Sequence, residues 1–273
     1  MRRERADCGG RMDEGEAIVN EQSRNFGSLA DGEQKTLYFT LSPEAELAVL
    51  ARMLYREGYN DHNWGHISYL QDDGTILLNP WEVPWDEMRA SDVLRIDDQG
   101  HLLSGRWTVT PAIALHLAAH RLRKDAKVAI HHHSRWGTVW GALGELPDVY
   151  HQNGAQLGRD IALYNEYESD VTHAEAAERN VLAMGDRKAA ILANHGVFVV
   201  AGSIKEAHTM CVSLEERARV AWHVKALGHD KGLPMQDKAV DSLVASIRAG
   251  RSGNRFYHAM IRREVLADAS VLT

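Results

Sequence analysis

The sequence predicts an α/β fold in which helices are layered against a central sheet. Short apolar stretches, such as residues 128–130 and 197–201, have the length and composition of buried strands. Longer stretches, such as residues 207–221, repeat apolar side chains at the 3.6-residue period of a helix. We find no internal repeat and no clear linker in the 273 residues, so we expect one folded domain.

The two ends of the chain differ in composition. Residues 1–36 are rich in Gly, Glu, Asp, Arg and Ser and contain few large apolar side chains, which predicts a mobile arm. The domain then spans residues 37–273 and ends in a helical extension. Its first helix is expected to have Ser42 as N-cap and Pro43 at its first position, and to end at Gly58.

Strand and helix signals alternate after the first helix. The turn Asp72-Asp73-Gly74 between two apolar runs predicts a hairpin. Ser203 and Glu206 form a capping box, which predicts the start of a long helix that ends near Gly228. We expect strands over residues 66–70, 75–78, 93–97, 127–130 and 189–193 (continued as 197–201), a loop over 79–85, and helices over 110–123, 153–163, 174–184, 203–228 and 237–249.

The composition restricts the classes of function. A net charge of −7 argues against a general nucleic-acid surface. No apolar run approaches the roughly 20 residues that span a bilayer, and no apolar region follows the charged N-terminus as in a secretory signal. Two cysteines, Cys8 and Cys211, do not make a disulfide framework. We therefore expect a cytoplasmic protein that acts on a small molecule and binds neither nucleic acid nor a membrane.

Histidines that follow two apolar strands give the main functional signal. Because side chains alternate along a strand, His131 and His133 point to one face and His132 to the other. A third imidazole, His195, follows the next apolar strand and precedes Gly196, which permits close approach of a ligand or a strand. Three imidazoles around one ion leave a position free for a substrate, which is typical of catalytic metal sites.

The pattern leaves alternatives open. Neutral imidazole suits zinc, iron, copper, nickel and cobalt, so the ligand type does not select the metal. A His-x-His sequence alone is weak evidence, since His132 is also a candidate for the inward side chain, with His131 and His133 in solvent. The addition of His195 favours the metal site.

The chain resembles the class II aldolase/adducin family over roughly residues 41–228. Four stretches carry the resemblance: Gly65-His66-Ile67-Ser68, Ala90-Ser91-Asp92-Val93, His131-x-His133, and Asn194-His195-Gly196-Val197-Phe198. The resemblance implies a three-layer α/β/α sandwich with a largely antiparallel central sheet. It also implies that His131, His133 and His195 bind one catalytic divalent metal, usually zinc, and that the protein is a homo-oligomer, usually a tetramer with sites at subunit interfaces.

The chain departs from the sugar-phosphate aldolases of that family in two places. Those enzymes carry an acid/base glutamate before the His-x-His strand, and the matching residue here is Ala112, which cannot transfer a proton. Their phosphate loops expose backbone N–H groups, whereas Pro80, Trp81 and Glu82 here remove a donor, fill space and repel phosphate. The resemblance and these departures together imply an unphosphorylated substrate.

Tryptophans are candidates for the substrate pocket. Trp64, Trp81, Trp136 and Trp140 lie near the segments that form the expected site. Trp81, Trp85, Trp136 and Trp140, with His66, are candidates to line a flat apolar pocket for an aromatic substrate, and Arg135 is a candidate partner for its carboxylate. The alternative is that the tryptophans pack loops and an interface while Arg135 makes a surface ion pair.

Two further polar side chains, those of His116 and Glu82, are candidates for catalytic roles. His116 and His120 are four residues apart on a predicted helix and share one face. His116 is one turn beyond Ala112, so it is a candidate to take over proton transfer. Glu82 is a candidate for a supporting role near the site.

The sequence is compatible with three functions. The first is a metal-dependent carbon–carbon lyase, an aldolase or decarboxylase, acting on an aromatic or hydrophobic keto or hydroxy acid. The second is an iron(II)-dependent oxygenase, similar to the branch that makes ring A of novobiocin and clorobiocin by oxidative decarboxylation. The third is an inert, adducin-like scaffold. Zinc and Fe(II) are the leading metals, and Mn and Co are further candidates.

Overall fold

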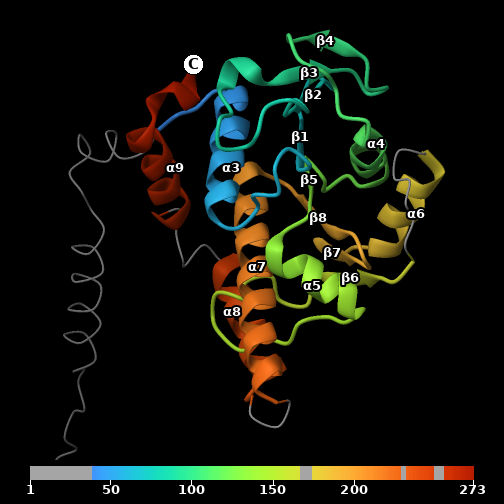
Figure 1. The fold of residues 1–273 in the computed structure, drawn as a ribbon, viewed down its shortest axis with the longest axis vertical. Helices are drawn as coiled ribbons and strands as arrows, with labels where there is room; N and C mark the ends of the chain where they lie inside the picture. The colour runs from blue at the N-terminus through green and yellow to red at the C-terminus, as the bar shows by residue number, and fades with distance from the viewer. Residues whose placement is uncertain (1–38, 167–173, 229–231, 249–254) are drawn as a thin grey trace, which may run out of the picture. The chain divides into compact units, whose positions relative to one another are not determined.

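The computed structural model describes residues 39–166, 174–228, 232–248 and 255–273. The predicted arm over residues 1–36 lies outside this part of the chain. In chain order the described elements (Figure 1) are α3 (Pro43–Arg56), β1 (His66–Leu70), β2 (Ile76–Leu78), η1 (Ala90–Asp92), β3 (Leu94–Ile96), β4 (Leu102–Ser104), α4 (Ile113–Leu122), β5 (Val128–His132), α5 (Arg135–Leu143), β6 (Ile161–Tyr164), α6 (Ala174–Met184), β7 (Ala189–Leu192), β8 (Gly196–Ala201), α7 (Ile204–Leu227), α8 (Asp237–Arg248), α9 (Arg255–Ala267) and η2 (Ala269–Leu272).

The described strands form one sheet in the order β4-β3-β2-β1-β5-β8-β7-β6. Neighbouring strands pair antiparallel except β6 and β7, which run parallel. An α/β fold with a largely antiparallel sheet is therefore confirmed, while its layering as a sandwich stays a prediction. None of the described helices is long and apolar enough to span a membrane.

The first helix, α3, forms as its terminal residues predict. The Ser42 hydroxyl accepts a hydrogen bond from the backbone N–H of Ala45 at 3.2 Å, and Pro43 occupies the first turn, where its missing N–H costs nothing. Glu44 and Glu46 place negative charge at the positive end of the helix dipole. Its buried face runs through Leu47, Leu50 and Leu54, as expected from the apolar spacing, and holds α3 against the rest of the domain.

Strand β5 lies at the centre of the sheet, between β1 and β8. All five of its residues are buried, and His131 lies opposite His66 on one side and Phe198 on the other. Ala129 and Phe198 belong to the buried apolar cluster beneath α4 and α6. Because side chains alternate, His131 shares that face, and His132 points to the opposite one.

The residues around His195 do not continue a strand, which corrects the expectation from the sequence. The chain reverses between β7 and β8, which pair antiparallel with Leu192 opposite Gly196. Asn194 sits at φ +55°, a left-handed conformation that Asn tolerates better than most residues. A Cβ at Gly196 would lie 2.5 Å from the carbonyl oxygen of His132, so glycine is required for the close approach of β8 to β5.

The helix expected over residues 153–163 is also absent from the structure. Turns occupy residues 151–159, and β6 follows. Gly158 has φ +64°, which interrupts any helix at that point, and its carbonyl oxygen accepts a hydrogen bond from the Arg217 guanidinium at 2.8 Å. The hydroxyl of Ser213 accepts the backbone N–H of Leu157 at 2.9 Å. Side chains of α7 thus satisfy the backbone groups that a helix would have paired internally.

Candidate metal centre

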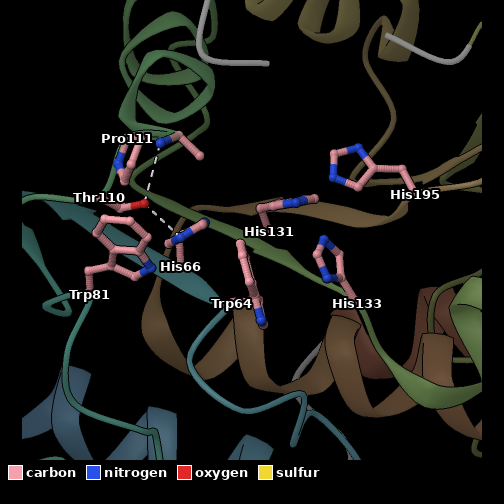
Figure 2. Close-up of a pocket in the computed structure, with 9 residues that line it drawn as sticks. Trp64, His66, Trp81, Thr110, Pro111, His131, His133 and His195 are labelled. Carbon is pink, nitrogen blue, oxygen red and sulfur yellow. Dashed lines mark hydrogen bonds between the residues drawn. The ribbon is translucent and has the colours of Figure 1, made fainter. Parts of the chain in front are cut away.

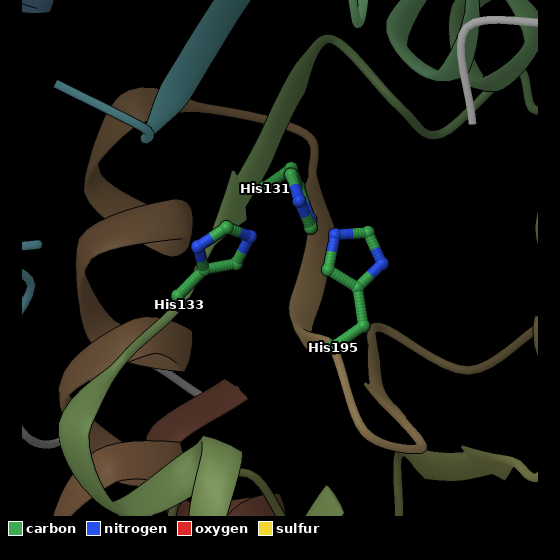
Figure 3. A group of neighbouring side chains, drawn as sticks. All are labelled: His131, His133 and His195. Atoms are coloured by element: carbon green, nitrogen blue, oxygen red, sulfur yellow. The ribbon is translucent and has the colours of Figure 1, made fainter. Parts of the chain in front are cut away.

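Three imidazoles converge where β5 ends and β7 turns into β8. His131 is in β5, His133 follows that strand directly, and His195 lies in the turn (Figure 3). One potential ligand nitrogen from each ring lies within 4.8 Å of the others. The ring centroids are 4.7 Å apart for His131 and His195, 5.1 Å for His133 and His195, and 5.3 Å for His131 and His133. This spacing suits three nitrogens that share one ion.

Hydrogen bonds to the far ring nitrogens fix the orientation of two of the three rings. Nδ1 of His131 donates to the backbone carbonyl of Val197 at 3.0 Å, and a carbonyl oxygen only accepts, so this nitrogen carries the proton. Nδ1 of His133 lies 2.9 Å from Oδ2 of Asp61. Nε2 of His133 is buried and has no hydrogen-bond partner among the described residues. Both rings therefore present an Nε2 lone pair, which fits metal ligation.

Burial keeps the imidazoles of His131 and His195 neutral. Burial, and then the proximity of His195, hold the pKa of His131 well below its usual value. Burial and the neighbouring His133 lower the pKa of His195 to about 4. Burial opposes the charge of Asp61, but hydrogen bonds from His62 and His133 outweigh it and lower the pKa of that carboxyl. At neutral pH His131 and His195 therefore offer neutral imidazoles, the form that binds a metal.

The triad opens into a cavity of about 210 Å³ (Figure 2). The residues that line it are Trp64, His66, Trp81, Thr110, Pro111, Ala112, His131, His133 and His195. Ala112 contributes a methyl group to the wall where the sugar-phosphate aldolases are expected to carry a glutamate. No Lys, Arg, Asp or Glu is among these described lining residues, so the wall combines imidazoles with an apolar surface.

Comparison with known proteins identifies the family. The family model described as "Class II Aldolase and Adducin N-terminal domain" matches residues 45–222, well over half of the chain. The chain belongs to the class II aldolase/adducin family. This confirms the resemblance inferred from the four sequence stretches.

Three related proteins show how similar this chain is to others in sequence and in structure. The meiotically up-regulated gene 14 protein of Schizosaccharomyces pombe is 29% identical over 176 residues, which cover 63% of this chain and 68% of the relative. The 5-deoxy-D-ribulose 1-phosphate aldolase of Bacillus thuringiensis is 28% identical over 191 residues, covering 69% and 88%. An aldolase II superfamily protein from Pseudomonas syringae superposes with a TM-score of 0.75 at 22% identity, covering 85% of this chain and 98% of that one, which shows the shared fold.

Among the predicted pocket residues of this class II aldolase/adducin family member, His66 and Trp81 line the cavity, whereas three tryptophans do not. Trp85 is buried against His132 on the other face of β5. Trp140 donates its indole N–H to the carbonyl of Ala218 in α7 at 2.8 Å. The ring of Trp136 lies 5.1 Å from that of Trp222. These three tryptophans pack elements together, which was the alternative interpretation.

The predicted charged residues also lie away from the cavity. Glu82 accepts a hydrogen bond from the backbone N–H of Thr108 at 3.1 Å and lines a separate, charged cavity that includes Arg52 and Arg106. Arg135 is exposed at the start of α5 and does not line the metal pocket. Among the described lining residues, the polar groups are therefore the imidazoles, the Thr110 hydroxyl and the indole N–H groups of Trp64 and Trp81.

His116 lies behind the cavity, fully buried, and does not line it. Burial lowers the pKa of His120, so its ring is neutral and carries one proton. Nδ1 of His120 lies 2.7 Å from the carbonyl oxygen of Ala126, which only accepts hydrogen bonds, so the proton is on Nδ1. Its Nε2 must then accept the Ser68 hydroxyl proton at 2.7 Å. Ser68 in turn accepts from Nδ1 of His116, also at 2.7 Å, which leaves Nε2 of His116 as a buried lone pair without a partner among the described residues.

Sequence reasoning missed Thr110, Pro111 and Asp61, and it placed Trp64 near the site without assigning it to the pocket. Trp64 and Thr110 line the cavity, and the Thr110 hydroxyl lies 2.7 Å from Nε2 of His66. Pro111 adds to the apolar wall, and Asp61 supports His133 from outside it. The position of Trp64 next to the Gly65-His66 motif was an available signal. No spacing in the sequence connects Asp61 with His133, which is 72 residues later.

Proposed function

We propose that this protein is a divalent-metal-dependent carbon–carbon lyase, an aldolase or a decarboxylase, that acts on an unphosphorylated aromatic or hydrophobic keto or hydroxy acid. The observation that carries the proposal is the convergence of His131, His133 and His195 on a cavity with aromatic and apolar walls. These three residues would hold the ion. When bound, a divalent metal stabilises the negative charge that develops on a substrate oxygen as a carbon–carbon bond breaks.

The walls of the cavity support a hydrophobic substrate. Trp64 and Trp81 offer flat apolar surfaces, and Pro111 and Ala112 extend them. The relatives named above include a sugar-phosphate aldolase, but the described lining here contains no Lys or Arg to pair with a phosphate. We therefore propose that this chain has departed from those relatives in its substrate and not in its metal.

The absent glutamate favours decarboxylation over aldol cleavage. Aldol cleavage begins with removal of a hydroxyl proton, and Ala112 has no group that accepts it. Decarboxylation of a β-keto acid needs no such step, because the electron pair of the broken bond to CO2 is taken up by the neighbouring carbonyl as an enolate, which is then protonated. His66 is fixed beside the triad by its 2.7 Å hydrogen bond with Thr110. It is the titratable side chain of the cavity that is not in the triad, so it is well placed to bind a polar substrate group.

The decisive experiment measures turnover with and without oxygen. Protein reconstituted with Zn²⁺ or Fe²⁺ is incubated with aromatic α-keto and β-keto acids, aromatic hydroxy acids and a sugar phosphate, while CO2, aldehyde and oxygen uptake are recorded. We expect product from the aromatic acids without oxygen, and none from His133→Ala, which should stay folded. Turnover of the sugar phosphate alone would contradict the proposed substrate class.

The second candidate is the iron(II)-dependent oxygenase, with which the three histidines are compatible because imidazole binds iron as well as zinc. Product that forms only with Fe²⁺ and stoichiometric oxygen uptake would establish it in place of the lyase. Less than about a tenth of an equivalent of metal after reconstitution would favour the inert scaffold. In all cases we propose a cytoplasmic homo-oligomer, a tetramer by analogy with the family.

A further inference from the structure

We propose that Asp61 is a positioning residue for the metal ligand His133, and that its loop joins the metal centre to the aromatic walls of the cavity. The inference rests on the proposed metal centre. It concerns a residue that does not line the cavity and that lies in the loop between α3 and β1.

Both carboxylate oxygens of Asp61 are engaged by imidazoles. Oδ2 lies 2.9 Å from Nδ1 of His133, and Oδ1 lies 3.1 Å from Nδ1 of His62. The Asp61 side chain is 33% exposed and that of His133 is 25% exposed, so the pair is partly shielded from water. His62 adopts φ +53°, a conformation rare for a non-glycine residue, which indicates that local contacts hold this loop in one shape.

The contact determines which nitrogen of His133 faces the triad. An ionised carboxylate only accepts hydrogen bonds, so Nδ1 of His133 keeps its proton and Nε2 keeps its lone pair. A carboxylate behind a ligating imidazole also makes the other nitrogen a stronger donor to a metal. His131 has a neutral carbonyl, that of Val197, in the same role. Asp61 therefore gives His133 a charged support that His131 does not receive from Val197.

The same loop reaches the walls of the cavity. The backbone N–H of Trp64 donates to the carbonyl oxygen of Asp61 at 3.1 Å, and the side-chain amide of Asn63 donates to the carbonyl of Trp81 at 3.1 Å. Trp64 and Trp81 both line the cavity. One short segment thus orients a metal ligand and fixes the positions of two aromatic walls.

The test compares zinc affinity in matched variants. Metal-free protein competes with a chromophoric chelator for Zn²⁺, and folding is checked by circular dichroism. We expect Asp61→Ala to bind zinc about 10- to 100-fold more weakly than the wild type. Asp61→Asn keeps an acceptor oxygen without the charge, so its zinc affinity should lie between those of the wild type and Asp61→Ala. The control is Asp72→Ala. Asp72 lies in the β1–β2 turn and forms an exposed ion pair with Lys127, so this variant should bind zinc as tightly as the wild type does.

A second readout needs neither metal nor substrate. Long-range ¹⁵N NMR of the metal-free protein should show the Nδ1–H tautomer for His133 in the wild type and in Asp61→Asn, and a mixture of tautomers in Asp61→Ala. Folded Asp61 variants that bind zinc within about twofold of the wild type would overturn this inference and leave the proposed function intact. A wild-type protein that binds neither Zn²⁺ nor Fe²⁺ would overturn both.

Discussion

The indole of Trp85 packs against the imidazole of His132, with ring centroids 4.7 Å apart, on the face of β5 opposite to the metal centre. Tyr59 contacts the same imidazole at 5.2 Å. Gly65 completes the contact, because a Cβ at that position would lie 2.3 Å from the His132 ring. The middle histidine of the run is therefore a core residue, while its two neighbours face the cavity.

We expect His132→Ala to destabilise the fold while leaving the metal site intact. The substitution leaves a void between Trp85 and Tyr59, and comparable losses of buried ring contacts cost about 2–4 kcal/mol. Denaturant unfolding and elemental analysis of zinc-loaded protein measure the two effects. His133→Ala is the matched control and should show the reverse pattern, with zinc lost and the fold retained. A folded His132→Ala protein without zinc would contradict the assignment of these faces.

Glu215 of α7 caps helix α5, which directly follows the metal ligand His133. Its carboxylate accepts the backbone N–H groups of Trp136 at 2.8 Å and Gly137 at 3.1 Å, whereas the N-cap residue of α5, Ser134, makes no capping bond. We expect Glu215→Ala to lower the free energy of unfolding by about 1–3 kcal/mol, because two N–H groups lose their acceptor in a buried place. Glu215→Gln keeps one acceptor oxygen and should cost less.

The control for this cap is the neighbouring Glu216, which pairs with Arg219 at 2.8 Å on a partly exposed surface. Glu216→Gln should change the free energy of unfolding by less than about 1 kcal/mol. Urea titrations of the three variants against the wild type give the comparison. Equal losses in Glu215→Ala and Glu216→Gln would show that the capping bonds contribute nothing particular.

Ser68 connects two histidines behind the cavity, and Ser68→Ala should break that connection. The hydroxyl accepts from Nδ1 of His116 and donates to Nε2 of His120, so its removal leaves two buried nitrogens without a partner. We expect both imidazoles to change their ¹⁵N shifts and the protein to lose about 1–3 kcal/mol of stability. Ser104→Ala, on an exposed strand, serves as the comparison. Unchanged shifts of both rings would refute the assigned tautomers.

Stability should fall on acidification because of His208, which is buried in α7 away from the metal centre. Burial, and then the charge of Arg263, lower its pKa to about 4, and its ring stacks on Phe256. The unfolded chain takes up a proton near pH 6.5, whereas the folded chain does not until about pH 4. The free energy of unfolding therefore has its full value above about pH 6.5 and decreases as the pH falls toward 4.

Replacement of His208 should remove its contribution to the pH dependence of the free energy of unfolding. His208→Phe should show a shallower loss of stability between pH 6.5 and 4 than the wild type, by up to about 1.4 kcal/mol per pH unit. Unfolding of metal-free protein at several pH values provides the measurement. The same slope in His208→Phe would assign the acid sensitivity to other groups.

Sequence patterns predicted the elements whose signals are local. The caps of α3 and α7 appear where Ser42 and Ser203 predicted them, and α6 spans the expected residues. The turn at Asn194 was missed because an apolar strand on each side of a short polar segment is compatible with one strand or with two. The helix expected near Gly158 failed because α7 supplies hydrogen-bond partners that no local pattern reveals.

The sequence by itself determined the family, the α/β class and the pairing of His131 with His133, because alternation along a strand and capping depend on neighbours in the chain. Only the tertiary structure decided that Trp64 and Trp81 face the triad while Trp85, Trp136 and Trp140 do not. It also brought Asp61 to His133. The physical reason is that a tryptophan has the same apolar character in a pocket wall and in a core. Its role depends on the surface that the folded chain places against it.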